Sequence, residues 1–345
     1  MKAMRLHSLM DLGKAGAEEG PLRLEEVACP QPGPGEVLLQ VQACGVCHTE
    51  LDEIEGRTPP PRLPVIPGHE VIGRVVSLGP GCSRHQPGDR VGVGWIHCGC
   101  GGEQENIQPG FLATGRDVDG GYAEYMTVPE GYAVPVPATL SALEAAPLLC
   151  AGAVGYRALR LTGLRNGERL GLTGFGGSAH LVLAMARHLY PDSPIQVYAR
   201  GEGSRQFARE QGADWVGETT AVPPEPPAAI IDTTPAWLPV LSALEVLRPG
   251  GRLVINAIRK EDTDHRELGR LSYHRHLWLE KEIKSVANVT VADIAGMLEL
   301  AGTIALKPVT ESYRLEEANR ALRELRSGGV RGAKVLVISE EESFP

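Results

Sequence analysis

Residues 174–179 read Gly174-Phe175-Gly176-Gly177-Ser178-Ala179, a G-x-G-x-x-A pattern. A short apolar stretch, 169–173, precedes the pattern, and an amphipathic segment, 178–190, follows it. In a turn from strand to helix, the first glycine permits a tight bend and the second lets the backbone approach a pyrophosphate. Such a pattern also arises by chance in glycine-rich loops. Its position between an expected strand and an expected helix indicates a dinucleotide-binding turn.

The chain on either side of this turn alternates between short apolar strands and helices. A succession of this kind predicts a parallel sheet of the doubly wound, Rossmann type. Beyond the segments already named, we expect strands at 195–199, 228–232 and 252–256, with helices at 204–211 and 238–247.

The end of the second strand bears on which dinucleotide is bound. An NAD-type fold places Asp or Glu there to accept a hydrogen bond from the ribose 2′-hydroxyl. Here the strand ends in Val197-Tyr198-Ala199-Arg200. A small residue followed by an arginine suits a 2′-phosphate, so the sequence favours NADP. The alternative is that Arg200 is a solvated loop charge.

Residues 1 to about 150 are rich in strands and turns. Strand candidates at 37–43 and 70–76 are separated by Gly/Pro-rich connectors such as 30–35, and this rhythm favours a partly open β-barrel. After about residue 287 the chain returns to helices at 291–300 and 315–326, with a last strand at 334–338.

Length and composition narrow the class of protein. A chain of 345 residues favours about two domains. The net charge is −9 without any Lys/Arg-rich run, which argues against nucleic acid or an anionic membrane as a partner. No apolar run reaches the roughly 18 residues of a membrane span, and no signal peptide is evident, so we expect a cytoplasmic protein.

Seven cysteines form an odd count, which favours metal or catalytic roles over a disulfide framework. The segment Cys44-Gly45-Val46-Cys47-His48-Thr49-Glu50 brings thiols, an imidazole and a hydroxyl together. Cys47, His69 and Cys150 would form a Cys2His set, which is typical of a catalytic zinc site with an open fourth position. Taken singly, each has another interpretation, because a lone cysteine or histidine is usually structural. Cys44 and Cys47 as a redox pair is a further alternative without a thioredoxin-like context.

Several motifs in order resemble the zinc-dependent alcohol dehydrogenases of the medium-chain dehydrogenase/reductase superfamily, and the later ones are similar to its bacterial, cinnamyl-alcohol-dehydrogenase-like branch. Besides the glycine-rich turn, they are Ala43-Cys44-Gly45-Val46-Cys47-His48-Thr49, Pro67-Gly68-His69-Glu70, Pro87-Gly88-Asp89-Arg90-Val91, Asp119-Gly120-Gly121-Tyr122-Ala123-Glu124-Tyr125, Leu149-Cys150-Ala151-Gly152, Leu253-Val254-Ile255-Asn256-Ala257-Ile258 and Ser285-Val286-Ala287-Asn288-Val289-Thr290.

The resemblance implies a role for each matching residue. Cys47, His69 and Cys150 would bind the zinc, with Glu70 beside the metal or exchanging onto it. Thr49 would hydrogen-bond the substrate oxygen and begin a proton relay. His48 and Arg331 would face the cofactor pyrophosphate, and Trp95 would form a wall of the substrate pocket.

The sequence departs from the family pattern in two places. Many relatives hold a structural zinc with four closely spaced cysteines, but here only Cys98 and Cys100 remain in that region, so we predict no structural zinc. Where relatives often carry a histidine that ends the proton relay, this chain has Asp52. Asp52 either accepts the proton, which needs a raised pKa, or has no catalytic role.

These inferences give an α/β protein with a GroES-like, partly open β-barrel catalytic domain and a Rossmann cofactor domain. The catalytic domain would span 1–150 and 287–345, and the cofactor domain 151–286. The expected function is zinc-dependent interconversion of alcohols with aldehydes or ketones by hydride transfer to or from NAD(P), in a homodimer or homotetramer. The alternatives are a zinc-free quinone reductase of the same superfamily and a non-catalytic nucleotide-binding sensor.

Overall fold

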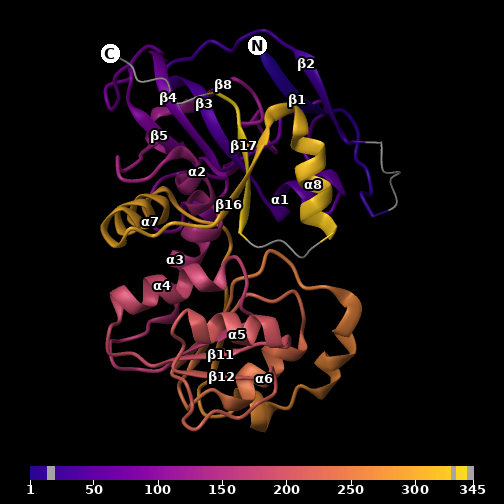
Figure 1. The fold of residues 1–345 in the computed structure, drawn as a ribbon, viewed down its shortest axis with the longest axis vertical. Helices are drawn as coiled ribbons and strands as arrows, with labels where there is room; N and C mark the ends of the chain where they lie inside the picture. Colours follow the sequence, from indigo (N-terminus) through magenta and orange to yellow (C-terminus); the bar gives the residue numbers. More distant parts are fainter. Residues whose placement is uncertain (14–19, 328–331, 340–345) are drawn as a thin grey trace. The chain divides into compact units, whose positions relative to one another are not determined.

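The computed structural model describes residues 1–13, 20–327 and 332–339 and divides into two compact units (Figure 1). Unit 1 comprises Met1–Cys150 and Asn288–Pro345, and unit 2 comprises Ala151–Ala287. Unit 2 is therefore an insertion between two parts of unit 1. Among the described residues, no helix has both the length and the apolar character needed to cross a membrane.

Unit 1 is built on a mixed sheet whose strands run in the order β16-β17-β3-β4-β5-β9, with β8 also paired to β3. The long central strand β3 is antiparallel to β4, β8 and β17, and its residues are almost all buried. The strands are β3 (Glu36–Val46), β4 (Val71–Leu78), β5 (Arg90–Val93), β8 (Tyr125–Pro129), β9 (Val134–Pro135), β16 (Thr310–Arg314) and β17 (Ala333–Val337).

Two short hairpin-like sheets and several helices complete unit 1. The two small sheets pair β1 (Lys2–Leu6) with β2 (Leu22–Glu26) and β6 (Ile96–Cys98) with β7 (Leu112–Ala113). The helices are α1 (His48–Ile54), α2 (Ala142–Ala145), α7 (Val291–Ile304) and α8 (Ala318–Ser327), with 3-10 turns at Glu105–Ile107, Glu130–Tyr132, Ala146–Leu149 and Leu315–Glu317.

The pairing of β17 with β3 holds in place the end of β3, which leads into Cys47. Lys334 lies opposite Val46 and Leu336 opposite Cys44, so a strand from the end of the chain borders the residues that lead into Cys47. Both strands contribute fully buried side chains to one apolar core, which includes Leu39, Val41 and Leu336. Burial of each such side chain contributes roughly 1.5–3 kcal/mol, so the core holds this end of β3 firmly.

Unit 2 is a six-stranded parallel sheet in the order β12-β11-β10-β13-β14-β15. Its strands β10, β11 and β13 are short, fully buried runs, as a sheet covered on both faces requires. The strands are β10 (Leu170–Thr173), β11 (Ile195–Tyr198), β12 (Trp215–Gly217), β13 (Ala229–Asp232), β14 (Arg252–Ile255) and β15 (Glu282–Ser285). The helices are α3 (Ala151–Thr162), α4 (Ala179–Leu189), α5 (Glu202–Glu210) and α6 (Leu238–Val246), with a 3-10 segment at Asp262–Arg270 and a π-helical turn at Tyr273–Leu277.

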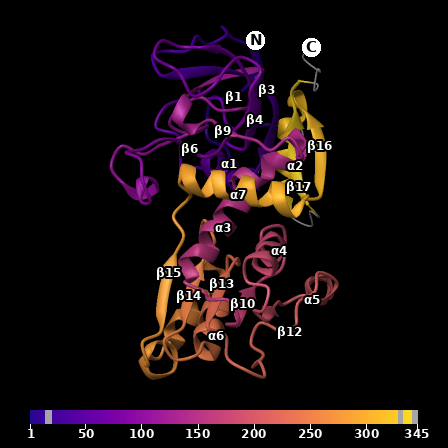
Figure 2. The same ribbon diagram turned by 90° about the vertical axis from the view of Figure 1, so that its left-hand side faces the viewer.

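After β10, the chain adds β11 and then β12 on one side of the sheet, and it then adds β13, β14 and β15 on the other side. The strand order therefore reverses between β10 and β13. The carboxyl ends of these two strands are where ligands bind in open sheets of this kind. Figure 2 shows β13, β14 and β15 side by side, with β15 at the edge of the sheet. The α/β fold class expected from the sequence is confirmed.

Candidate active site

One cluster in unit 1 gathers Cys47, His69, Glu70 and Cys150. Cys47 is the N-cap of α1, directly after β3, whereas His69 and Glu70 immediately precede β4. Cys150 follows the 3-10 turn Ala146–Leu149. One ligand atom from each of the four lies within 4.8 Å of every other. Segments far apart in the sequence thus meet where β3 ends and β4 begins.

The geometry of this cluster fits a tetrahedral zinc ion. Sulfur atoms that are each about 2.3 Å from a tetrahedral zinc lie about 3.8 Å apart, and the Sγ atoms of Cys47 and Cys150 are 3.7 Å apart. Nε2 of His69 is buried and has no hydrogen-bond partner among the described residues. A buried polar atom without a partner is unfavourable unless a ligand satisfies it. Two thiolates and a neutral imidazole also balance the charge of Zn2+.

Glu50 orients the histidine, and the sequence analysis did not identify this residue. Its Oε1 is hydrogen-bonded to Nδ1 of His69, and both side chains are completely buried. Its Oε2 accepts a hydrogen bond of 2.9 Å from the backbone N–H of Cys47. A carboxylate on the far nitrogen fixes the ring orientation of a metal-binding histidine. Glu50 lies three residues after the N-cap Cys47, which is the position of a capping-box acid. This spacing could have predicted that the Glu50 carboxylate points back toward Cys47, because a capping-box side chain reaches the start of its helix.

The protonation of the metal-free cluster also suits a cation. A hydrogen bond from the Cys150 thiol lowers the pKa of Cys47 well below its usual range, and the same contact raises the pKa of Cys150. Burial lowers the pKa of His69, but the Glu50 carboxylate and the Cys47 thiolate together outweigh burial and raise that pKa well above its usual range. In the metal-free cluster, Cys150 and His69 therefore hold protons next to the Cys47 thiolate. A divalent cation would displace these protons on binding.

Glu70 is packed against a position that only glycine can occupy. A Cβ atom on Gly45 would lie 1.7 Å from Oε2 of Glu70. Burial, and then the negative charge of Cys47, raises the pKa of Glu70 well above its usual range. The carboxyl group is therefore placed beside the thiols by the close approach of β3.

Cys44 lies near the cluster but belongs to the core. Its Sγ would be 2.9 Å from a Cβ added to Gly68 and 3.1 Å from one added to Gly121. Burial raises the pKa of the Cys44 thiol well above its usual range. A buried neutral thiol of this kind packs as a small apolar group.

Helix α1 carries three further predicted residues. Thr49 is buried, and its Oγ1 lies 3.7 Å from Sγ of Cys47, so its hydroxyl is at the cluster. His48, in contrast, is exposed. Asp52 is buried and ion-paired with Arg57, with 2.5 Å between Oδ1 and Nε. The structure thus brings Thr49 to the cluster and engages Asp52 elsewhere.

Trp95 stands beside the cluster, with its ring centroid 6.5 Å from that of His69. Two further side chains lie close to the Trp95 ring. The ring centroid of Phe111 is 5.5 Å from that of Trp95, and the guanidinium carbon of Arg116 is 5.0 Å from the Trp95 centroid. Nε1 of Trp95 donates a hydrogen bond of 3.2 Å to Glu53. Burial, followed by the negative charge of Glu50, raises the pKa of Glu53 to about 8. Glu53 is a second buried acid near the cluster that the sequence analysis did not identify.

Cys98 and Cys100 are engaged locally. The thiol of Cys98 donates to the backbone carbonyl of Gly110, and that of Cys100 donates to Gly101, both at 3.6 Å. The expectation that this region binds no structural zinc stays a prediction.

The glycine-rich turn of unit 2 has the backbone conformation that its sequence requires. Gly174 has φ of 76°, a left-handed value that favours glycine. A Cβ atom on Gly176 or Gly177 would meet nothing within 4 Å, so the backbone there faces open space. Ser178 is the N-cap of α4, and the buried Ala179 is its first residue. The turn can therefore receive an anion at the start of α4.

The end of β11 presents an unpaired cation. Ala199 is buried, and Arg200 is exposed. The guanidinium of Arg205 donates to the backbone carbonyls of Ala199 and Arg200, at 3.0 and 2.8 Å, which fixes this turn. The Arg200 side chain has no hydrogen-bond or ion-pair partner in the described part of the chain. Arg331 lies outside the described residues.

A Rossmann unit with this turn, joined to a mixed-sheet unit with this thiol–imidazole cluster, defines the class of medium-chain, dinucleotide-linked dehydrogenases. Residues 33–138 match the alcohol dehydrogenase GroES-like domain. The chain is 41% identical to a probable alcohol dehydrogenase, AdhA, of Mycobacterium tuberculosis, over 332 residues that cover 93% of this chain and 94% of the relative. It belongs to the zinc-type alcohol dehydrogenase family of this superfamily, as the sequence motifs predicted.

Further relatives agree with this placement. An alcohol dehydrogenase of Geobacillus stearothermophilus is 32% identical over 337 residues, which cover 93% of this chain and 96% of the relative. Among solved structures, a cinnamyl alcohol dehydrogenase of Sorghum bicolor superposes with a TM-score of 0.80 at 26% identity, covering 99% of both chains.

Proposed function

We propose that the protein interconverts alcohols with aldehydes or ketones, using NAD(P)(H) and one zinc ion per chain. The observation that carries this proposal is the cluster of Cys47, His69 and Cys150. Its sulfurs are 3.7 Å apart, and the buried Nε2 of His69 has no hydrogen-bond partner among the residues that the structure describes. Zinc held there would favour loss of the alcohol proton and would polarise a carbonyl, while the nicotinamide would accept or supply hydride.

The residues of the chain prepare this site in distinct ways. Glu50 holds His69 so that Nε2 remains free for the metal. Thr49 places a hydroxyl at the cluster, where it can exchange a hydrogen bond with the reacting oxygen of the substrate. Trp95 supplies an aromatic surface beside His69, which suits the carbon skeleton of a small alcohol or aldehyde.

We also propose that the cofactor is NADP(H) rather than NAD(H). Arg200 follows the small residue Ala199 at the end of β11, where an NAD-binding chain would place an acid. The guanidinium is exposed, and Arg205 fixes the backbone that carries it. A 2′-phosphate would supply the missing partner.

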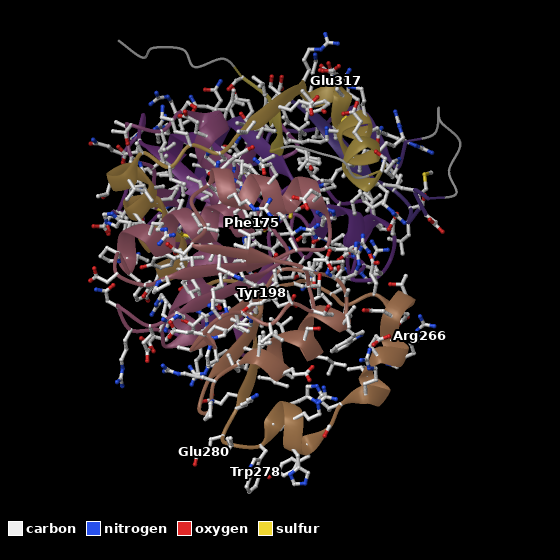
Figure 3. All side chains as sticks on the ribbon, turned by 60° about the horizontal axis from the view of Figure 1, so that its bottom comes forward. Phe175, Tyr198, Arg266, Trp278, Glu280 and Glu317 are labelled. Atoms are coloured by element: carbon white, nitrogen blue, oxygen red, sulfur yellow. The ribbon has the colours of Figure 1, made fainter. Side chains whose placement is uncertain are left out.

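We also propose a homodimer joined through the edge of unit 2. All four residues of β15 are exposed, and its outer edge has no strand partner in the described part of unit 2. Figure 3 labels Trp278 and Glu280, whose side chains point away from the ribbon. Trp278 is 51% exposed and Ile283 46%. An unpaired edge with apolar side chains is a template for a second strand, so Ile283→Lys should convert the dimer to a monomer in light scattering.

A reducing compartment, and hence the cytoplasm, suits this chain because the cluster needs free thiols. All seven cysteines are unpaired.

One experiment separates the proposed function from its rivals. Purified protein is titrated with a series of alcohols while NAD(P)H absorbance is followed, and its metal content is measured in parallel. Alcohol-dependent reduction with about one zinc per chain is the expected result. Quinone turnover without zinc would instead support a quinone reductase, and cofactor binding without turnover would support a sensor.

A further inference from the structure

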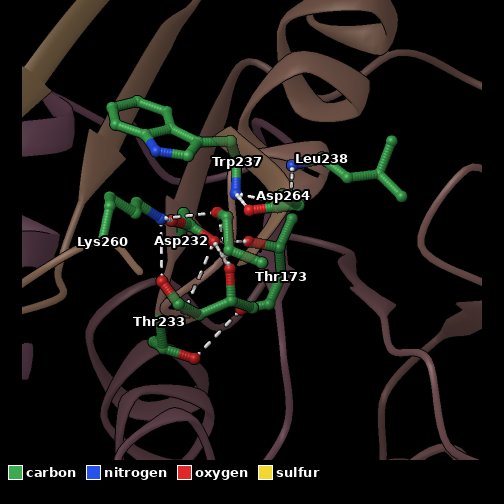
Figure 4. Close-up of polar contacts among 9 residues, drawn as sticks. Thr173, Asp232, Thr233, Trp237, Leu238, Lys260 and Asp264 are labelled. Atoms are coloured by element: carbon green, nitrogen blue, oxygen red, sulfur yellow. Dashed lines mark hydrogen bonds and ion pairs between the residues drawn. The ribbon is translucent and has the colours of Figure 1, made fainter. Parts of the chain in front are cut away.

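A buried ion pair lies at the carboxyl end of β13, outside the cluster already described. Asp232, the last residue of β13, is fully buried, and its carboxylate is bonded to Nζ of Lys260, which is itself 9% exposed (Figure 4). Nζ also donates to the backbone carbonyls of Thr234, at 2.7 Å, and Ala236, at 3.0 Å. An ammonium group has three donors, so Lys260 has none left for a ligand.

The Asp232 carboxylate links the two strands at which the sheet order reverses. It accepts hydrogen bonds from the hydroxyls of Thr173, at 2.5 Å, and Thr234, at 2.8 Å. Thr173 is the last residue of β10, so one carboxylate ties the end of β10 to the end of β13. Dinucleotides bind beyond these strand ends in sheets of this type.

The same segment of chain that supplies Lys260 also holds the far end of the loop after β13. Asp264 accepts hydrogen bonds from the backbone N–H groups of Trp237, at 2.9 and 3.0 Å, and Leu238, at 2.8 Å. These groups begin α6, which has no side-chain cap of its own. Lys260 therefore holds the loop 233–237 at Thr234 and Ala236, and Asp264 holds its last residue, Trp237.

This loop rests directly on the glycine-rich turn. Thr233 donates to the carbonyl of Thr173 both from its backbone N–H and from its hydroxyl, each at 3.0 Å. A Cβ atom on Gly174 would lie 2.8 Å from Cγ2 of Thr234 and 3.0 Å from Oγ1 of Thr233. A shift of the loop would therefore change the shape of the turn.

We propose that Lys260 is a positioning residue for the dinucleotide, because it holds the loop 233–237 against the turn at Gly174. The inference rests on the proposed cofactor binding and adds a residue to it. A buried ion pair contributes little net stability compared with apolar packing, so stability alone is a poor explanation for it. Loss of the lysine frees the loop, and binding must then restore its order, which weakens affinity.

The test measures cofactor affinity directly. NADPH is titrated into wild-type protein and Lys260→Met at a temperature at which circular dichroism shows both to be folded. We expect the dissociation constant to rise about 10-fold or more, and kcat at saturating cofactor to fall by a smaller factor. An unchanged dissociation constant would overturn the proposal.

A matched control and a second variant keep this test decisive. Lys281 also donates to three backbone carbonyls, of Leu244, Glu245 and Arg275, but it lies at the amino end of the edge strand β15, away from the carboxyl ends of β10 and β13. Lys281→Met should leave NADPH affinity as it is. If Lys260→Met does not fold, Asp232→Asn/Lys260→Met removes both charges, and wild-type affinity in that variant would overturn the proposal. A wild-type protein that binds no dinucleotide would instead refute the proposed function.

Discussion

His69 and Glu50 form a completely buried pair in which Nδ1 of the imidazole is hydrogen-bonded to the carboxylate, while Nε2 has no partner in the described part of the chain. The two nitrogens thus have different surroundings, and only Nε2 is available to a metal. The second oxygen of Glu50 accepts from the backbone of Cys47, so one carboxylate orients the first two predicted ligands.

Glu50→Gln tests this arrangement. The amide keeps the size of the side chain but removes the charge that holds the imidazole, and such outer partners typically change metal affinity 10- to 100-fold. We expect zinc affinity, measured by competition with a chromogenic chelator, to fall by a factor in that range. Glu55→Gln is the matched control, because Glu55 also belongs to the α1 region but pairs with Arg57 and Arg326. Equal affinity in Glu50→Gln and wild type would contradict the assigned role.

Asp52→Asn separates the two roles left open for that residue. The ion pair with Arg57 favours a structural role, and Arg57 is 36% exposed, so solvent moderates the loss. We expect the free energy of unfolding to fall by about 1–2 kcal/mol. We also expect the pH profile of kcat to keep the ionisations of the wild type. Disappearance of one ionisation from that profile would assign the proton relay to Asp52.

Arg200→Ala tests cofactor choice. Removing a charge-assisted hydrogen bond to the 2′-phosphate should raise the KM for NADP about 10-fold or more, with little change for NAD. Arg209→Ala provides the control, since Arg209 pairs with Glu202 on α5. Equal effects of Arg200→Ala on both dinucleotides would remove the argument for NADP.

Glu53 predicts a dependence of stability on pH in the zinc-free protein. Because its pKa is raised to about 8 in the fold, the folded state holds one proton more than the unfolded state between about pH 4.5 and 8. Stability should therefore fall as the pH rises through this window, by at most about 1.4 kcal/mol per pH unit. Urea unfolding at several pH values should show a flatter dependence for Glu53→Gln. Parallel curves for the two proteins would refute the assignment.

The parts of the fold that the sequence predicted are those with strong local patterns. The strand before Gly174 is a short, fully buried run, and the helix after the glycine-rich turn begins at Ala179, the last residue of the pattern. Strand β15 was not predicted, because Glu282–Ser285 is exposed throughout and has no apolar run. It forms because β14 offers it a hydrogen-bonding edge, which is a tertiary effect. Helix α5 begins at Glu202, two residues before the expected position.

In the site, the sequence and its family resemblance pointed to Cys47, His69 and Cys150, which the structure brings together. The partners that orient them were harder to foresee. Glu50 resembles an ordinary acid in the first turn of a helix until His69 is placed beside it. Likewise, Asp232 and Lys260 are 28 residues apart, and no local pattern connects them.

Zinc content tests the central claim most directly. Wild-type protein should contain about one zinc ion per chain, whereas Cys47→Ser should lose the metal and most of its turnover while keeping dinucleotide binding. Cys44→Ser, which changes a packed thiol three residues away, should retain the metal. Undiminished zinc in Cys47→Ser, or full alcohol turnover by a zinc-depleted protein, would contradict the account.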